Sequence, residues 1–228
     1  MARNLKVLSA GAVQPGLTRL TNAFRLDGEL SVEIEFATAP AIAKRIAAGH
    51  PTDVIVAPPD LLETLKSTGP LPSRTVVLGR IGVGVMVRAG ARLPGIANTA
   101  EFIRSLHIAE QIVYNQASTG IYLDSLFQRL GLAAMLEAKT TRYPDFAAVC
   151  NHLNSGHGNA IGFGATTVII ESADKGVTFV GPLPVEIQNY TTYAAALISN
   201  GGDGAAAAFL EYLATPAAKS ILRSAGIE

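Results

Sequence analysis

The sequence predicts an α/β protein of two lobes, and three observations support this fold class. Three units of strand, small-residue turn and helix follow one another between residues 5 and 65. A β-rich stretch, residues 76–87, then breaks this rhythm and indicates a strand that passes into a second lobe. Two amphipathic helices, residues 206–213 and 216–225, follow a later crossover and close the chain. The 228 residues suffice for one large α/β domain or two lobes of about 100 residues each.

The three N-terminal units belong to the first lobe. Apolar and β-branched residues predict strands at residues 5–8, 32–36 and 53–57. Pro15, Pro40 and Pro59 each stand where the first turn of a helix accepts proline. Successive strand–helix units are typical of a parallel sheet covered by helices.

The middle of the chain reads as an inserted α/β lobe. Its expected elements are a helix at 98–107, a strand at 112–114, helices around 123–130 and 146–153, a strand at 160–163, one or two helical turns at 165–170 and a strand at 177–180. Crossovers at Arg80–Gly82 and Pro182–Pro184 are expected to form a two-strand hinge. The predicted lobes are residues 1–80 with 184–228, and residues 81–183, each a mainly parallel sheet flanked by helices.

Composition excludes several classes of function. Eighteen basic and eighteen acidic residues cancel without blocks of like charge, which argues against nucleic-acid binding and anionic membranes. Apolar runs are far shorter than the roughly 20 residues of a membrane-spanning helix. The residues after Met1 leave no room for a signal peptide, which predicts a cytoplasmic protein as written; a chain trimmed at a mature N-terminus and given a new Met would look the same.

The turn at Tyr114–Gly120 joins a short apolar strand to a periodic helix. Its small hydroxyl and glycine residues let backbone N–H groups approach a bound group at the positive end of the helix. The alternative is an ordinary helix start, with Ser118 or Thr119 as the N-cap and no ligand.

Three such turns are expected to meet at one cleft between the lobes: residues 11–14, 38–41 and 118–120. Each follows the carboxyl end of a strand, where open α/β sheets bind ligands. None of the three contains Arg or Lys, whereas multiply charged organic acids usually recruit an arginine fork. We therefore expect a small oxyanion, a monocarboxylate or a neutral polar molecule.

Tyrosine and asparagine side chains are further candidates to line the cleft and stack on a flat ligand. The alternative is that each tyrosine ring is half-buried in packing contacts while its hydroxyl faces solvent. These candidates are Tyr114, Tyr122, Asn189, Tyr190 and Tyr193.

Metal and cofactor chemistry is not expected. Cys150, His152 and His157 are close in sequence, but helix positions two apart point in different directions, and His157 lies beyond Gly156. Cys150 lies on an apolar stripe and reads as a buried, inert thiol. The sequence contains no nucleophile elbow, glycine-rich phosphate loop or close carboxylate pair, so we expect a protein that is not an enzyme.

Several stretches resemble type II periplasmic solute-binding proteins, and among them the molybdate-binding proteins of ABC transporters. The resemblance covers nearly the whole chain. It rests on the order and spacing of residues 36–46 with Gly49, residues 53–56, residues 126–132, and residues 208–219 with Gly226 and Ile227. It implies a two-lobed fold of this type, a monomer, an ABC permease as partner and a periplasmic location.

The resemblance also implies a ligand shell that this sequence alters. The family binds its oxyanion with serine hydroxyls and helix N-terminal amides. The first family serine falls at Gly11 or Ala12 and the second at Ala39, while the tyrosine of the second lobe falls at Phe163. The predicted ligand-binding residues are Gly11, Ala12, Val13, Thr38, Ala39, Asn115, Ser118, Thr119, Gly120, Tyr122, Phe163 and Tyr190.

Three functions follow from these observations. The first is a solute-binding protein that closes its lobes around a small anion or polar organic ligand. The second is a cytoplasmic ligand sensor, in keeping with the absent signal peptide. The third is an enzyme that reuses the cleft with a tyrosine or histidine as acid or base, which requires Tyr114, Tyr122 or Tyr190 within hydrogen-bond reach of His152 or His157.

Overall fold

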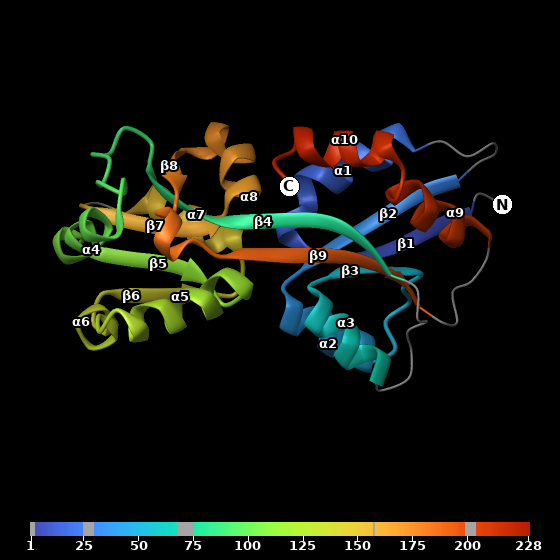
Figure 1. Ribbon diagram of the computed structural model, residues 1–228, viewed down its shortest axis with the longest axis horizontal. Coiled ribbons are helices and arrows are strands. Elements are labelled where there is room, and N and C mark those ends of the chain that lie inside the picture. The colour runs from blue at the N-terminus through green and yellow to red at the C-terminus, as the bar shows by residue number, and fades with distance from the viewer. Residues whose placement is uncertain (1–2, 25–29, 68–74, 157, 199–203) are drawn as a thin grey trace. The chain divides into compact units, whose positions relative to one another are not determined.

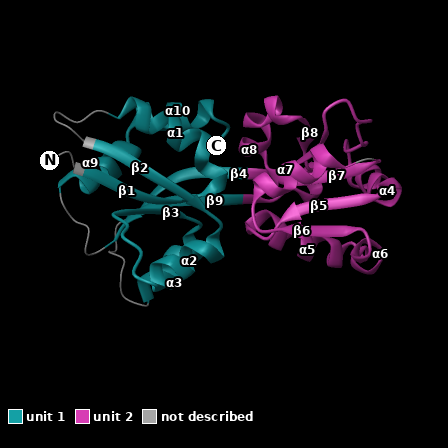
Figure 2. Ribbon diagram, turned by 180° about the vertical axis from the view of Figure 1, so that it is seen from behind, with its two compact units in different colours: residues 1–81, 191–228 teal, residues 82–190 magenta. Residues whose placement is uncertain are grey.

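The computed structural model describes residues 3–24, 30–67, 75–156, 158–198 and 204–228. The chain divides into two compact units, with residues 1–81 and 191–228 in unit 1 and residues 82–190 in unit 2 (Figure 2). Strands β4 (Thr75–Arg88) and β9 (Tyr190–Leu197) each pass from one unit to the other.

The second division comes after Tyr190, later than the crossover expected at Pro182–Pro184. The intervening segment is anchored inside unit 2. Ile187 is buried in a core cluster of that unit, and its carbonyl oxygen accepts a hydrogen bond of 2.6 Å from the Tyr122 hydroxyl. Pro182 and Pro184 therefore lie in a turn within unit 2, and the chain leaves this unit only with β9.

Unit 1 begins with the alternation of strands and helices that the sequence predicts. Its elements before the crossover are β1 (Arg3–Ala10), the 3₁₀ turn η1 (Gly11–Val13), α1 (Gln14–Ala23), β2 (Leu30–Ala37), α2 (Ala39–Ala47), β3 (Val54–Ala57) and α3 (Pro59–Ser67). After β9 the chain adds α9 (Gly204–Leu213) and α10 (Pro216–Ser224). Proline occupies the first turn of α1, α2 and α10, where its missing N–H costs no helical hydrogen bond.

The sheet of unit 1 is parallel at its centre. β1 pairs in parallel with β2 on one side and with β3 on the other, and β9 then adds to β3 in antiparallel fashion. Figure 1 shows α1 and α10 on one face of this sheet and α2 and α3 on the other. The predicted parallel arrangement of the first three strands is confirmed.

Helices α1 and α10 approach each other closely in unit 1. A Cβ atom on Gly16 would lie 2.7 Å from Ile227 and 2.9 Å from Leu222, so only glycine fits at this position without movement of its neighbours. Phe24, at the end of α1, packs its ring 5.0 Å from that of Phe209 on α9. These contacts join the N-terminal and C-terminal parts of the chain in one core.

Unit 2 is a second mixed α/β layer structure. Its elements after β4 are α4 (Thr99–Ile108), β5 (Gln111–Asn115), α5 (Ser118–Arg129), α6 (Ala133–Glu137), β6 (Thr140–Tyr143), α7 (Phe146–Ser155), β7 (Ala160–Ala165), α8 (Thr166–Glu171), η2 (Ala173–Lys175), β8 (Val177–Pro182) and η3 (Val185–Ile187). β5 is parallel to both β6 and β7, whereas β4 is antiparallel to β7 and β8.

The sheet of unit 2 has a hydrophobic core on each face. Val85, Ile112 and Tyr114 pack with α4, α5 and α6 on one face, while Met86 and Val113 pack with α7 and α8 on the other. Neighbouring residues of β4 and β5 thus point to opposite sides, as a pleated strand requires. Among the described residues, no helix is long and apolar enough to cross a membrane.

Candidate functional site

In unit 1, two turns leave the sheet at adjacent strand ends. Ala10, the last residue of β1, is the register partner of Ala37, the last residue of β2. The segments that follow, Gly11–Val13 and Thr38–Ala39, therefore start side by side at the carboxyl edge of the sheet. This edge is where open α/β sheets bind ligands.

The turn after β1 is the short 3₁₀ helix η1, which runs directly into α1. Val13 is fully buried, backbone included, so it belongs to the core of unit 1 and presents no exposed surface in this structure. Gly11 and Ala12 are half-buried. A Cβ atom on Gly11 would meet no heavy atom within 4 Å, which shows open space beside this backbone.

The turn after β2 starts helix α2. Thr38 is its N-cap residue, in an extended conformation, and its side chain makes no capping hydrogen bond. The Thr38 carbonyl accepts the N–H of Ile42 at 2.9 Å, which leaves Ala39 and Ala41 in the first turn, where backbone N–H groups have no intrahelical acceptor. Pro40 removes the donor between them.

Sequence reasoning did not assign a ligand role to the third turn of this edge. β3 pairs with β1 so that Val56 stands beside Ser9, and the turn at Pro58 therefore follows the neighbouring strand end. Its two consecutive prolines supply no N–H donor. The parallel register, rather than any residue type, is the signal that places this turn beside the others.

In unit 2, the turn after β5 is held by side-chain and backbone contacts. The Asn115 side-chain oxygen accepts the N–H of Ala117 at 3.1 Å, and Ala117 is the N-cap residue of α5. The alternative that Ser118 or Thr119 caps this helix is wrong, because both stand inside its first turn and no side chain makes the capping bond. Both are half-buried.

Gly120 brings the first turn of α5 against the end of β5. A Cβ atom on Gly120 would lie 1.8 Å from the carbonyl oxygen of Asn115 and 3.1 Å from the Tyr114 ring. Because real Cβ contacts are never this short, only glycine allows this approach. The turn therefore has one fixed shape.

Two further predicted ligand-binding residues of unit 2, Tyr122 and Phe163, make contacts within the fold. The Tyr122 hydroxyl donates to the carbonyl of Ile187, and the Arg129 guanidinium lies 5.5 Å from its ring centre. The Phe163 side chain is completely buried. Its ring centre lies 6.0 Å from that of Phe102 and 6.3 Å from that of Phe127, so it contributes to the core of unit 2.

The other cleft candidates divide in the same way. Tyr190 keeps 43% of its surface exposed, whereas Tyr193 is buried and Asn189 is half-buried. Tyr114 is fully buried and donates its hydroxyl to the Asp124 carboxylate at 2.7 Å. Burial first, and then this hydrogen bond, raises the pKa of Tyr114 far above its usual range, so the phenol stays protonated near neutral pH.

The histidine needed for a tyrosine–histidine pair is engaged elsewhere. His152 Nδ1 lies 2.7 Å from the Tyr143 hydroxyl, and its Nε2 lies 2.7 Å from the Gln111 side-chain oxygen. Both ring nitrogens are thus occupied by residues other than Tyr114, Tyr122 and Tyr190. The second histidine of that hypothesis, His157, lies outside the described residues.

No metal centre is formed by the described residues, among which no three His, Cys, Asp or Glu side chains gather. Cys150 is buried, and this burial raises the pKa of its thiol to about 11. The thiol is therefore protonated and unreactive near neutral pH.

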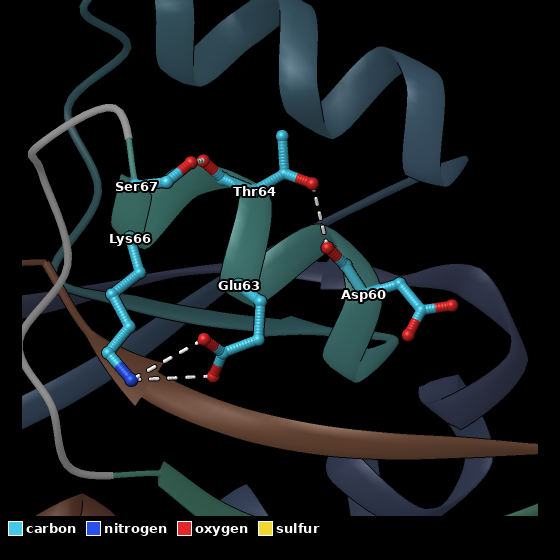
Figure 3. Close-up of polar contacts among 5 residues, drawn as sticks. All are labelled: Asp60, Glu63, Thr64, Lys66 and Ser67. Carbon is cyan, nitrogen blue, oxygen red and sulfur yellow. Dashed lines mark hydrogen bonds and ion pairs between the residues drawn. The ribbon is translucent and has the colours of Figure 1, made fainter.

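A polar cluster on the exposed face of α3 consists of side-chain contacts that form no binding site. Thr64 and Ser67 donate their hydroxyls to backbone carbonyls of their own helix, and Lys66 lies 3.4 Å from the Glu63 carboxylate (Figure 3). All belong to one exposed helix face. Such i to i+3 and i+4 contacts stabilise a solvated surface and build no concave group of donors.

Comparison with known proteins identifies a family whose model matches nearly the whole chain. The family model described as bacterial extracellular solute-binding protein matches residues 5–228. A relative named aconitate isomerase from Pseudomonas sp. is 28% identical over 98% of this chain and 87% of its own length.

Two solved structures show the same fold at low sequence identity. The periplasmic molybdate-binding protein of Azotobacter vinelandii is 21% identical, with a TM-score of 0.80 and 98% of each chain covered. The sulfate-binding protein SubI of Mycobacterium tuberculosis H37Rv is 14% identical, with a TM-score of 0.80, 99% of this chain and 86% of its own chain covered. The predicted type II solute-binding fold is confirmed.

Proposed function

Because the chain belongs to the family of bacterial extracellular solute-binding proteins, we propose that it captures a small anion or small polar organic ligand and presents it to an ABC permease. The observation that carries this proposal is the side-by-side start of the Gly11–Val13 and Thr38–Ala39 turns at one sheet edge. We propose that the α5 turn of unit 2 also contributes donors to ligand binding and that the protein acts in the periplasm, which the description of its family as extracellular solute-binding proteins supports.

The donors in these turns favour an anion of low charge. Backbone N–H groups at the start of α2 and α5 carry partial positive charge from their helices, and Thr38, Ser118 and Thr119 add hydroxyls. The turns contain no Arg or Lys to neutralise several negative charges. A singly charged oxyanion or a monocarboxylate fits this donor set better than a tricarboxylate.

A panel of ligands tests the proposal. Isothermal calorimetry and thermal unfolding would be measured with molybdate, tungstate, sulfate, acetate, lactate and aconitate. A true ligand at about a hundred times its Kd should stabilise the folded protein by about 2.7 kcal/mol. Absence of stabilisation by every member of the panel, with no compaction in solution scattering, contradicts the proposal.

A paired variant locates the binding site. Ser118→Ala combined with Thr119→Val removes both hydroxyls of the α5 turn and should weaken the best anion of the panel at least tenfold, because a hydrogen bond to a charged group contributes about 1.5–3 kcal/mol. Ser125→Ala is the control, since Ser125 is an exposed hydroxyl on the same helix outside the turn. Equal affinity of the paired variant and the control would remove the α5 turn from the site.

A second candidate function is an isomerase that acts on aconitate. The observation that favours it is the named relative, which matches 98% of this chain. Nuclear magnetic resonance of either aconitate isomer incubated with the protein would resolve its conversion into the other. Catalysed conversion would replace the transport proposal with this one, whereas aconitate binding without conversion would broaden the ligand class and keep transport.

A further inference from the structure

Gln188 makes an unusual set of contacts at the edge of unit 2. Its side-chain oxygen accepts the Val83 N–H at 2.9 Å, and its side-chain nitrogen donates to the Val83 carbonyl at 3.0 Å. The amide group thus satisfies both backbone groups of Val83, as a neighbouring strand does in a ladder. The same side-chain oxygen accepts the N–H of Asn189 at 2.9 Å.

Val83 stands at one end of the pairing of β4 with β7. Its register partner on β7 is Ala165, the last residue of that strand, and pairing with β8 begins one residue later at Gly84. The preceding residue, Gly82, is the first residue of unit 2. The Val83 carbonyl also accepts the Leu183 N–H at 3.1 Å, so Gln188 adds a side-chain contact to Val83 beside the point where β4 enters the unit.

The returning chain is fixed at the same place. The Asn189 carbonyl accepts the Val83 N–H at 3.3 Å, and β9 starts at Tyr190. A Cβ atom on Gly82 would lie 3.2 Å from the Tyr190 ring and 3.3 Å from the Gln188 side-chain nitrogen. The Gln188 side chain and the Asn189 backbone thereby both join the incoming and the outgoing segments of unit 2.

Unit 1 holds β4 by a different device. Arg80 and Glu228 exchange both backbone hydrogen bonds, at 2.7 and 3.0 Å, and a Cβ atom on Gly79 would lie 2.5 Å from the Glu228 carbonyl oxygen. Lys219 of α10 donates to the carbonyls of Val77 and Leu78. On this side the anchor is backbone and helix packing, whereas on the unit 2 side the Gln188 side chain adds to backbone hydrogen bonds of Val83 with Leu183 and Asn189.

We propose that Gln188 is a positioning residue of the hinge. It fixes where both crossing segments leave unit 2, and it confines bending between the units to Ile81–Gly82 on one segment and Tyr190–Thr191 on the other. The proposal rests on the proposed solute-binding function only where it concerns affinity, because a hinge fixed at its end loses less conformational freedom when the protein closes on a ligand. The positions at which the hinge ends do not depend on a bound ligand.

Hydrogen exchange tests the local part of the proposal without any ligand. In Gln188→Ala the amide hydrogen of Val83 should exchange about tenfold faster or more, because its main acceptor is removed. The amide of Val87, which lies in the same strand and pairs with β8, should keep its rate. Gln128→Ala, an exposed glutamine of α5, is the matched control and should change neither rate.

Distances between the units test the hinge itself. Spin labels on Glu63→Cys in α3 and Ala134→Cys in α6, two exposed positions, would be placed in a Cys150→Ala background. Pulsed electron paramagnetic resonance of the ligand-free protein should give a broader distance distribution for Gln188→Ala than for Gln128→Ala. Gln188→Glu should broaden it as well, because its carboxylate cannot donate to the Val83 carbonyl.

The outcomes separate the two proposals. An unchanged Val83 rate and an unchanged distance distribution overturn the assignment of Gln188, and so does faster exchange throughout unit 2, which would mean general destabilisation. A broader distribution with a local change at Val83 supports it, even if no panel member binds and the solute-binding proposal fails. Where molybdate or a carboxylate does bind, Gln188→Ala should raise its Kd about threefold to tenfold.

Discussion

The turns of unit 1 and the turn of unit 2 are built on opposite principles. Gly11 has no heavy atom within 4 Å of the position of an added Cβ, whereas at Gly120 that atom would lie 1.8 Å from the Asn115 carbonyl oxygen. The unit 1 turns follow adjacent parallel strands, and the backbone at Gly11 lies beside open space. The α5 turn is fixed by the contacts of Asn115 and by close packing of helix on strand.

We infer from this difference that the turns of the two units have separate tasks in the proposed ligand binding. At Gly11 the unit 1 turn leaves space for a larger side chain, so this position can be changed without disturbing the fold. The α5 turn of unit 2 carries Ser118 and Thr119 on a turn of fixed shape, so its donors are held in place before a ligand arrives. We expect unit 1 to tune affinity and unit 2 to determine specificity.

The largest expected effect comes from a methyl group at the fixed turn. Gly120→Ala should lower the free energy of unfolding by about 3 kcal/mol or more, because overpacking at this distance forces the backbone to move. Gly11→Ala should change it by less than about 0.5 kcal/mol, since the site is open. Urea denaturation followed by circular dichroism measures both. Equal destabilisation by the two substitutions would show that the turns do not differ in packing.

The next largest effect is expected when hydroxyls are added to the unit 1 turns. Molybdate should bind the unmodified protein weakly or not at all, because Ala12 and Ala39 offer only backbone donors and Pro40 offers none. Ala12→Ser combined with Ala39→Ser should tighten molybdate binding by about two orders of magnitude, at about 1.5–3 kcal/mol for each new hydrogen bond to the anion.

Calorimetry of the double variant beside the unmodified protein measures this change. The same two alanines can be changed to valine as a control, because valine adds volume without a hydroxyl. Tight molybdate binding by the unmodified protein would show that backbone amides and Thr38 suffice, and the expectation of weak molybdate affinity from the altered shell would then be wrong.

The smallest effect concerns Tyr122, next to the fixed turn. Its hydroxyl donates to the Ile187 carbonyl at 2.6 Å, so Tyr122→Phe should cost about 1 kcal/mol of stability. Ligand affinity should change less than about twofold if the hydroxyl makes only this hydrogen bond. A larger loss of affinity, without a matching loss of stability, would return Tyr122 to the ligand shell.

Local pattern in the sequence was sufficient for most elements of the fold. Proline in the first turns of α1, α2 and α10 predicted where these helices begin, and the short apolar runs before α1 and α2 predicted strands. The predicted start of a helix at residue 146 is confirmed by α7, and Asp145 caps it by accepting the N–H of Ala148 at 2.9 Å. These features are decided within a few residues, which is why one sequence reveals them.

What the tertiary structure decided is which face each side chain meets. Phe163 and Tyr114 resemble exposed candidates in the sequence, yet both rings are fully buried, and the Tyr122 hydroxyl is bound to a carbonyl 65 residues away. The Gln188 side chain meets Val83 across 105 residues of sequence. The sequence by itself determined the order of strands and helices because side-chain periodicity, helix caps and turn residues act over a few positions. Only the packing of distant segments decided which polar groups remain for a ligand and which are used to hold the fold.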